Sequence, residues 1–248
     1  MLKLRLIPVL TFDGISLVKT KEFSESRIVG NPIQAARVYN SRNVDELVFI
    51  DIKASEQKRK INLSLVKKVI DECFMPVTIG GGINTFDDIN NLLGIGADKI
   101  LIKSKAIDDP IFIENAVKYF GSQCISISVD VIKKNEQFFI YNLHKNDLQL
   151  NDFINEMNKI KVGEFIVNAV YKDGLMNGFD SKLYKIISNI SSVPIVALGG
   201  AGKPEDFTKL IESGFFGGLA SSSIYHFTQY TPNDIKLVLN ESEIPVRI

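Results

Sequence analysis

The sequence contains one strand-and-turn motif twice: Pro-Val-Thr-Ile-Gly-Gly-Gly-Ile at residues 76–83 and Pro-Ile-Val-Ala-Leu-Gly-Gly-Ala-Gly at residues 194–202. In each copy, a short apolar run leads directly into consecutive glycines. The two copies lie roughly half a chain apart, which indicates a duplicated unit. We expect each copy to end the third strand of its half.

Short β-rich runs alternate with longer helical patterns on both sides of these motifs. Strands are expected at residues 4–10, 46–51, 76–79, 99–102, 124–129, 164–169, 194–198 and 217–220. Helices are expected at residues 31–42, 63–73, 85–93, 110–120, 149–160, 182–188, 203–212 and 231–240. An unbroken strand–helix order implies parallel pairing with crossover helices. Eight units predict one (β/α)8 TIM barrel of two similar half-barrels over residues 1–248.

One insertion interrupts this order. Residues 131–144 include Phe138-Phe139-Ile140-Tyr141, and we expect them to form a hairpin over the mouth of the barrel.

The charge composition favours some classes of binding partner over others. Lys plus Arg and Asp plus Glu both number 29, so the chain lacks the basic excess that nucleic acids or anionic membranes attract. Its N-terminus is too short and too charged for a signal peptide, and no apolar run is long enough for a membrane helix. We therefore expect a cytoplasmic protein. We expect no cofactor, and no metal either, because no spacing of His, Asp and Glu residues suggests metal ligands.

The glycine turns predict phosphate binding. Backbone N–H groups reach a phosphate where glycines follow a strand and precede a helix. An alternative is that these glycines merely permit tight turns, but two copies in matching positions favour the first interpretation. The predicted phosphate-binding residues are Gly81, Gly82 and Ser104 in the first half, and Asp173, Gly174, Gly199, Gly200, Ser222 and Ser223 in the second.

A family resemblance emerges from motifs spread over nearly the whole chain. They are Arg5, Ile7-Pro8, residues 44–49, Asp51, Gly80-Gly81-Gly82-Ile83, residues 96–99, residues 120–123, Asp130 and Gly199-Gly200-Ala201-Gly202. The chain resembles HisF, the cyclase subunit of imidazole glycerol phosphate synthase. The resemblance implies a barrel that docks a HisH-like glutaminase on its bottom face and conducts ammonia through its core. It also implies a lyase reaction that joins this ammonia to a bis-phosphorylated nucleotide precursor of histidine.

Five charged residues match positions that the HisF family uses at the bottom of the barrel. Arg5, Glu46, Lys99 and Glu164 correspond to the ammonia gate, and Asp98 to the glutaminase interface. Two cations and two anions at one barrel end can neutralise each other. Without the resemblance, the same residues would be read as solvated charges at strand ends.

The sequence departs from the family at one catalytic position. The family's cyclase uses two aspartates, one after the first strand and one after the fifth; Asp130 keeps the second position, but Thr11 occupies the first. A threonine hydroxyl cannot act as a base near neutral pH, so cyclisation is in doubt. Asp13 could substitute only if its loop turned inward. Lys19 remains in the first loop, where it could hold a substrate phosphate or carboxylate.

Other family positions have changed as well. Lys103 stands where the family usually has asparagine, and Asn168 and Leu175 stand where it usually has threonine. Lys103 could favour a differently placed anion.

The sequence resembles one group within the family more closely, the HisF-like proteins associated with glycosyl amidation in surface-polysaccharide synthesis. The sequence segments that resemble this group include residues 7–10, 17–20, 29–33 and 72–76. The resemblance implies a subunit that conducts ammonia from a glutaminase to a separate sugar amidotransferase for O-antigen or related glycans. Two alternatives stay open: a working cyclase of histidine biosynthesis, and a scaffold that activates its glutaminase.

Overall fold

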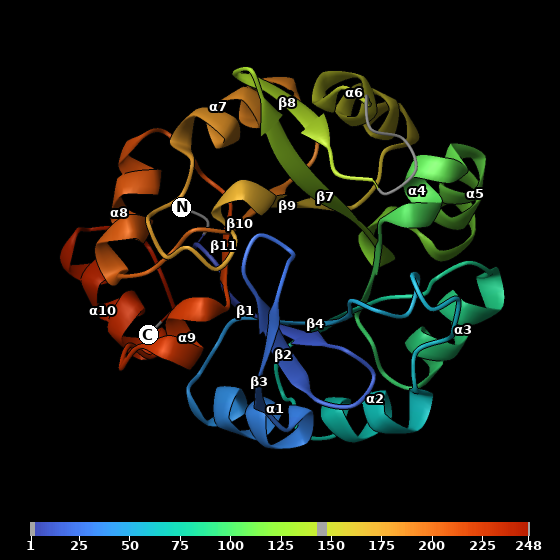
Figure 1. Ribbon diagram of the computed structural model, residues 1–248, viewed down its shortest axis with the longest axis horizontal. Coiled ribbons are helices and arrows are strands. Elements are labelled where there is room, and N and C mark those ends of the chain that lie inside the picture. The colour runs from blue at the N-terminus through green and yellow to red at the C-terminus, as the bar shows by residue number, and fades with distance from the viewer. Residues whose placement is uncertain (1–2, 143–147, 248) are drawn as a thin grey trace.

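A closed parallel barrel forms the centre of the protein. The computed structural model describes residues 3–142 and 148–247. In these ranges, eight parallel strands pair in sequence, and the last pairs with the first (Figure 1). They are β1 (Leu6–Phe12), β4 (Leu47–Asp51), β5 (Val77–Gly80), β6 (Lys99–Ile102), β7 (Ile125–Lys134), β9 (Glu164–Ala169), β10 (Ile195–Leu198) and β11 (Gly218–Ser221). The predicted (β/α)8 barrel is confirmed.

Helices surround this barrel on the outside (Figure 1). The longer ones are α1 (Pro32–Ser41), α2 (Leu63–Ile70), α3 (Phe86–Gly94), α5 (Pro110–Phe120), α6 (Leu150–Ile160), α7 (Ser181–Ile190), α8 (Pro204–Glu212) and α10 (Pro232–Glu241). Two short helices, α4 (Ser104–Asp108) and α9 (Ser223–Phe227), follow β6 and β11, and the 3-10 turns are η1 (Ser122–Cys124) and η2 (Val170–Lys172). In the described part of the chain, no helix is long and apolar enough to cross a membrane.

Side-chain alternation along the strands separates two apolar regions. Leu6 and Leu10 of β1 belong to the large core between strands and helices, whereas Ile7 and Val9 belong to a smaller cluster inside the barrel. Successive residues of a strand point to opposite faces, so each strand contributes to both regions. Thr11 lies in phase with Ile7 and Val9, and therefore on the interior face.

The two halves repeat in detail. β5 and α3 of the first half correspond in length and spacing to β10 and α8 of the second. Asp88 in α3 accepts hydrogen bonds from the backbone N–H groups of Asn84 and Thr85, and Asp206 in α8 accepts them from the equivalent Gly202 and Lys203. The same helix start therefore follows both glycine turns.

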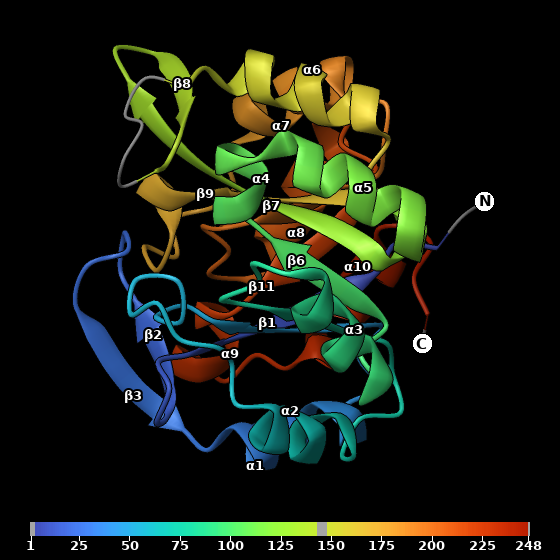
Figure 2. The ribbon, with the colours of Figure 1, turned by 90° about the vertical axis from the view of Figure 1, so that its right-hand side faces the viewer.

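Two hairpins extend beyond the barrel at one end, and both chain termini lie at the other (Figure 2). β8 (Gln137–Ile140) pairs with the extended end of β7, which confirms the hairpin predicted for the insertion as far as it is described; His144 lies outside the described residues. The second hairpin, β2 (Leu17–Thr20) with β3 (Ser26–Gly30), was not predicted. The side chains of β3 are largely exposed, so its sequence lacks the alternation that marks a strand.

Candidate functional site at the two ends of the barrel

Four charged side chains close a ring at the N-terminal end of the barrel. Arg5 lies 2.7 Å from Glu46 and 3.1 Å from Glu164. Lys99 Nζ completes the ring at 3.1 Å from Glu46 Oε2 and 2.8 Å from Glu164 Oε1. The structure thus brings together the four residues that the sequence singled out there, and each cation contacts both carboxylates.

Burial and ion pairing shift the pKa values of Arg5 and Glu164 in opposite directions. Burial would raise the pKa of Glu164, but Lys99 and Arg5 outweigh that effect and hold the pKa below its ordinary value. Burial would lower the pKa of Arg5, and the two glutamates raise it instead. Arg5 and Glu164 therefore keep their charges near neutral pH, as buried ions do when they are paired.

An aliphatic cluster lies inside the barrel beyond the ring. The interior cluster consists of Ile7, Val9, Val48, Leu101, Ile166, Val196, Leu198 and Ala220, with Ile50 packed against it. Gly218 of β11 faces the ring, where a Cβ would lie 3.3 Å from Arg5 Nη2. The ring thus lies next to this aliphatic cluster.

Thr11, next to the C-terminal residue of β1, and Asp130, just before β7 begins its pairing with β8, occupy the interior face. Thr11 Oγ1 donates a hydrogen bond to the carbonyl oxygen of Val18 on β2. Asp130 Oδ2 lies 2.6 Å from Lys103 Nζ. Acid and base roles can be divided between two carboxylates. Here only one carboxylate, that of Asp130, is present at these two positions, and it is paired with Lys103.

Asp13 does not take the place of the missing aspartate. Its Oδ1 accepts hydrogen bonds from the backbone N–H groups of Ile15 and Ser16, both at 2.8 Å. The carboxylate thus closes a turn of its own loop.

A bidentate ion pair beside this loop was missed by the sequence analysis. Arg59 reaches both oxygens of Asp51, at 2.5 and 2.8 Å, and donates to the carbonyl oxygen of Asp13 at 3.1 Å. Asp51 also accepts from the backbone N–H of Ala54. The pair joins the first and second loops. Asp51 is a strand-end carboxylate, but nothing in the sequence identifies Arg59 as its partner.

Lys19 and Asp173 are joined, which the sequence analysis did not foresee. The Lys19 Nζ lies 2.6 Å from Asp173 Oδ1, and Thr20 Oγ1 donates to Oδ2 at 3.3 Å. Gly174 has φ +75°, and a Cβ there would lie 2.6 Å from the Thr20 carbonyl oxygen. Asp173 and Gly174 therefore contact the β2–β3 hairpin instead of standing open to a ligand.

The glycine turns have the left-handed backbone that the phosphate hypothesis requires. Gly81 and Gly82 have φ of +114° and +69°, and the matching Gly199 and Gly200 have +99° and +106°. A Cβ at Gly81 would lie 2.3 Å from the backbone carbonyl oxygen of Asp51, and one at Gly200 would lie 2.3 Å from that of Gly178. Glycine is thus required at both turns by conformation and by space.

The hydroxyl groups beside these turns differ between the halves. Ser222 and Ser223 are each 6% exposed, and their Oγ atoms have no hydrogen-bond partner within the described residues. Ser104, the equivalent of Ser223, is half-buried. Because an unsatisfied buried hydroxyl costs about 1–3 kcal/mol, the second half favours a polar ligand more strongly.

Asp98 is exposed at the N-terminal end of the barrel, next to β6. Its Oδ2 accepts a hydrogen bond from the backbone N–H of Val77 at 2.8 Å. The residue is therefore fixed in place while its side chain remains accessible to a partner.

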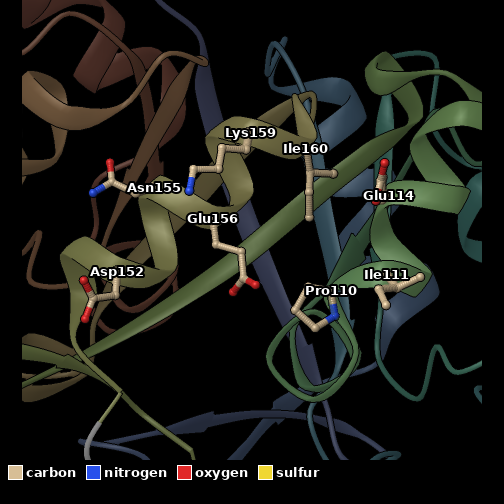
Figure 3. A pocket seen from close by; sticks show the side chains of 8 residues that line it. All are labelled: Pro110, Ile111, Glu114, Asp152, Asn155, Glu156, Lys159 and Ile160. Carbon is tan, nitrogen blue, oxygen red and sulfur yellow. The ribbon is translucent and has the colours of Figure 1, made fainter.

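A groove on the outside of the barrel lies between α5 and α6 (Figure 3). It is lined by Pro110, Ile111, Glu114, Asp152, Asn155, Glu156, Lys159 and Ile160. Glu114 is paired with Lys118. The groove contains none of the predicted site residues.

Comparison with known proteins gives relatives over the whole chain. Residues 5–231 match the family described as histidine biosynthesis protein. A Campylobacter jejuni protein provisionally named imidazole glycerol phosphate synthase subunit hisF2 is 41% identical over all of both chains. A Vibrio vulnificus protein with the same provisional name is 38% identical over all of this chain and 92% of its own. The imidazole glycerol phosphate synthase subunit HisF of Natranaerobius thermophilus is 37% identical over all of both chains.

Proposed function

The chain belongs to the histidine biosynthesis protein family and is HisF-like over its full length, and from that premise we propose that it conducts ammonia without closing an imidazole ring. One observation carries the proposal: neither cyclase position offers a free carboxylate. Thr11 is bound to Val18, and Asp130 is paired with Lys103. The charged ring, by contrast, is complete.

The route for ammonia runs, in this proposal, from the ring past the aliphatic cluster inside the barrel. A neutral molecule such as NH3 crosses apolar surroundings at far lower cost than an ion such as NH4⁺. The ring bonds are side-chain contacts, so small rotations of Lys99 or Arg5 open a path without disturbing the strands. The proposed gate is therefore Arg5, Glu46, Lys99 and Glu164.

The glutaminase that supplies ammonia docks, in this proposal, around the ring. Asp98 lies there, and three exposed aromatic residues occupy loops or helix ends that lead into strands at the same end: Phe74 (92% exposed), Phe216 (77%) and Tyr119 (74%). Exposed aromatic side chains on one face are typical of protein interfaces. In this proposal, the hydrolysis of glutamine belongs to the partner.

The opposite end binds an anionic, phosphorylated ligand in this proposal. The strongest support is the pair of buried hydroxyls Ser222 and Ser223 next to the Gly199–Gly200 turn. Gly81, Gly82 and Ser104 form the weaker, first-half counterpart. Asp173 and Gly174 contribute indirectly, because they hold the β2–β3 hairpin over this end.

The acceptor of the ammonia is, in this proposal, a sugar handled by a separate amidotransferase of O-antigen or related glycan synthesis. The hisF2 names of two relatives fit a second HisF-like protein beside the histidine enzyme. The competing function is the cyclase reaction of histidine biosynthesis, favoured by the relatives named HisF.

The gate is tested by substituting Lys99→Ala in the complex with a glutaminase and a sugar amidotransferase. Glutamine-dependent amidation is expected to fall several-fold, while amidation driven by added ammonium salt is retained. Lys118→Ala, an exposed lysine of α5, is the control. If glutamine-dependent amidation were unchanged in Lys99→Ala, the barrel would be a scaffold and not a conduit.

A further inference from the structure

Lys103 is the centre of a compact cluster at the mouth of the barrel. Its Nζ lies 2.6 Å from Asp130 Oδ2. The same atom lies 4.8 Å from the ring centroid of Tyr141 and 5.6 Å from that of Phe23. The two rings meet edge to face at 5.3 Å. The Lys103 ammonium therefore contacts Asp130 of β7, Phe23 in the turn between β2 and β3, and Tyr141 directly after β8.

The two partners of this ion pair differ in their access to solvent. The Asp130 side chain is 9% exposed and the Lys103 side chain 27%. The backbone carbonyl of Asp130 also accepts from the Tyr141 N–H at 2.7 Å, which fixes the aspartate. Lys103 is thus the accessible and movable member of the pair, and Asp130 the fixed one.

Lys103 also lies next to the first glycine turn. It directly follows β6, and β6 pairs with β5 up to Gly80 and Leu101, so Lys103 and the turn at Gly81 and Gly82 share one end of adjacent strands. In the second half, the position of Lys103 is taken by Ser222. The first half therefore has a cation where the second half has a hydroxyl.

We propose that Lys103 selects anionic ligands and that Asp130 competes with them as an internal competitor. The Asp130 carboxylate pairs with the Lys103 ammonium until a phosphate or carboxylate group of a ligand replaces it. The inference rests on the anion binding proposed above and assigns its first-half selectivity to Lys103. Phe23 and Tyr141 flank the ammonium in both states, because the face of an aromatic ring attracts a cation. Ligand exchange at Lys103 is thereby linked to the β2–β3 hairpin through Phe23.

While Asp130 is paired with Lys103, the site cannot bind phosphate. The apparent affinity for phosphate is therefore the intrinsic affinity multiplied by the fraction of time for which Lys103 is unpaired. Removing the competitor must therefore strengthen binding. With Asp130 holding Lys103 for about nine-tenths of the time, Asp130→Asn is expected to bind inorganic phosphate about tenfold more tightly than the wild type. Lys103→Met is expected to bind it more weakly than the wild type. Calorimetric titration at constant ionic strength measures both.

The double variant separates competition from simple repulsion. If Asp130 acts through Lys103, Lys103→Met/Asp130→Asn binds phosphate no better than Lys103→Met alone. A gain in the double variant equal to that of the single Asp130→Asn would overturn the proposal, because Asp130 would then only repel anions. Phosphate binding that is undetectable in Asp130→Asn would overturn it as well.

Lys105, in the short helix α4 that begins directly after Lys103, provides a matched control. It is paired with Asp109 at 2.9 Å and lies 5.2 Å from the Phe112 ring centroid, so it reproduces the ion pair and the cation–π contact away from the mouth. Asp109→Asn is expected to leave phosphate affinity unchanged; a gain like that of Asp130→Asn would contradict the proposal. Lys103→Asn serves as a second variant if Lys103→Met folds poorly. None of these results depends on the Lys99 gate, so the two proposals fail separately.

Discussion

The Lys19 ammonium lies 2.6 Å from the Asp173 carboxylate, and only 5% and 7% of the two side chains are exposed. The pair connects β2 to the loop after β9. The β2–β3 hairpin is held by two further contacts, from Thr11 to Val18 and from Phe23 to Lys103 and Tyr141. These contacts hold the hairpin over the mouth, and two of the residues that make them, Thr11 and Lys19, are among those predicted to be catalytic.

Lys19→Met is expected to destabilise the protein by about 3–5 kcal/mol, because it leaves the Asp173 carboxylate buried without its cation. Chemical denaturation measures the free energy of unfolding. Lys53→Met, which removes an exposed pair with Glu56, is the control and should change stability by less than about 1 kcal/mol. Equal effects of the two substitutions would contradict the role of the buried pair.

The stability provided by Glu164 should depend on pH. Its pKa in the folded protein is lowered, since Lys99 and Arg5 outweigh the effect of burial. Its contribution is therefore present above its unfolded pKa, near 4.5, and is lost as the pH falls through the lower folded value. The difference in unfolding free energy between wild type and Glu164→Gln should be largest near neutral pH and shrink below about pH 4. A difference that grew on acidification would contradict this sign.

His226 offers a test of the electrostatics at the mouth. Its pKa is lowered from 6.5, first by burial and then by the charge of Lys19. Lys19→Met should therefore raise the pKa of His226, although not above its ordinary value, because burial remains. The chain has two histidines, so an NMR titration with His144→Gln as the assignment variant can follow His226 alone. An unchanged or lower pKa would show that Lys19 exerts no field there.

Thr11 should hold the hairpin through its hydroxyl. Thr11→Val keeps the shape but removes the donor to Val18, a loss of about 1 kcal/mol. Thr11→Asp places an acceptor against the same carbonyl oxygen and should loosen the hairpin more. Hydrogen exchange of residues 17–30 should be several-fold faster in Thr11→Val and faster still in Thr11→Asp. Unaltered exchange in both variants would show that the hydroxyl does not fasten the hairpin.

Much of the fold could be predicted from local patterns. The repeated glycine turns and the alternation of strands and helices indicated the barrel, because each signal lies within one short segment. The ring of Arg5, Glu46, Lys99 and Glu164 was predicted through the resemblance to HisF, because strand-end charges by themselves indicate only solvated residues.

The partners at the mouth could not be predicted, because they depend on contacts distant in sequence. Lys19 and Asp173 are far apart in the chain, and the β2–β3 hairpin that brings them together has no alternating pattern. Likewise, Lys103 was recognised as an unusual residue, but its pairing with Asp130 follows from the closing of the barrel. Helices as short as α4 and α9 carry too little periodicity to be detected.

We propose that this HisF-like barrel does not cyclise. The most direct measurement supplies the purified protein with the bis-phosphorylated nucleotide precursor of histidine and ammonium salt, and follows formation of imidazole glycerol phosphate. Ammonium replaces the glutaminase, so the assay reports on the mouth of the barrel alone. We predict no turnover above the uncatalysed rate in the wild type, because Thr11 leaves the mouth without the second carboxylate that divided acid and base roles require. Formation of the imidazole product by the wild-type protein at an enzymatic rate would contradict the account.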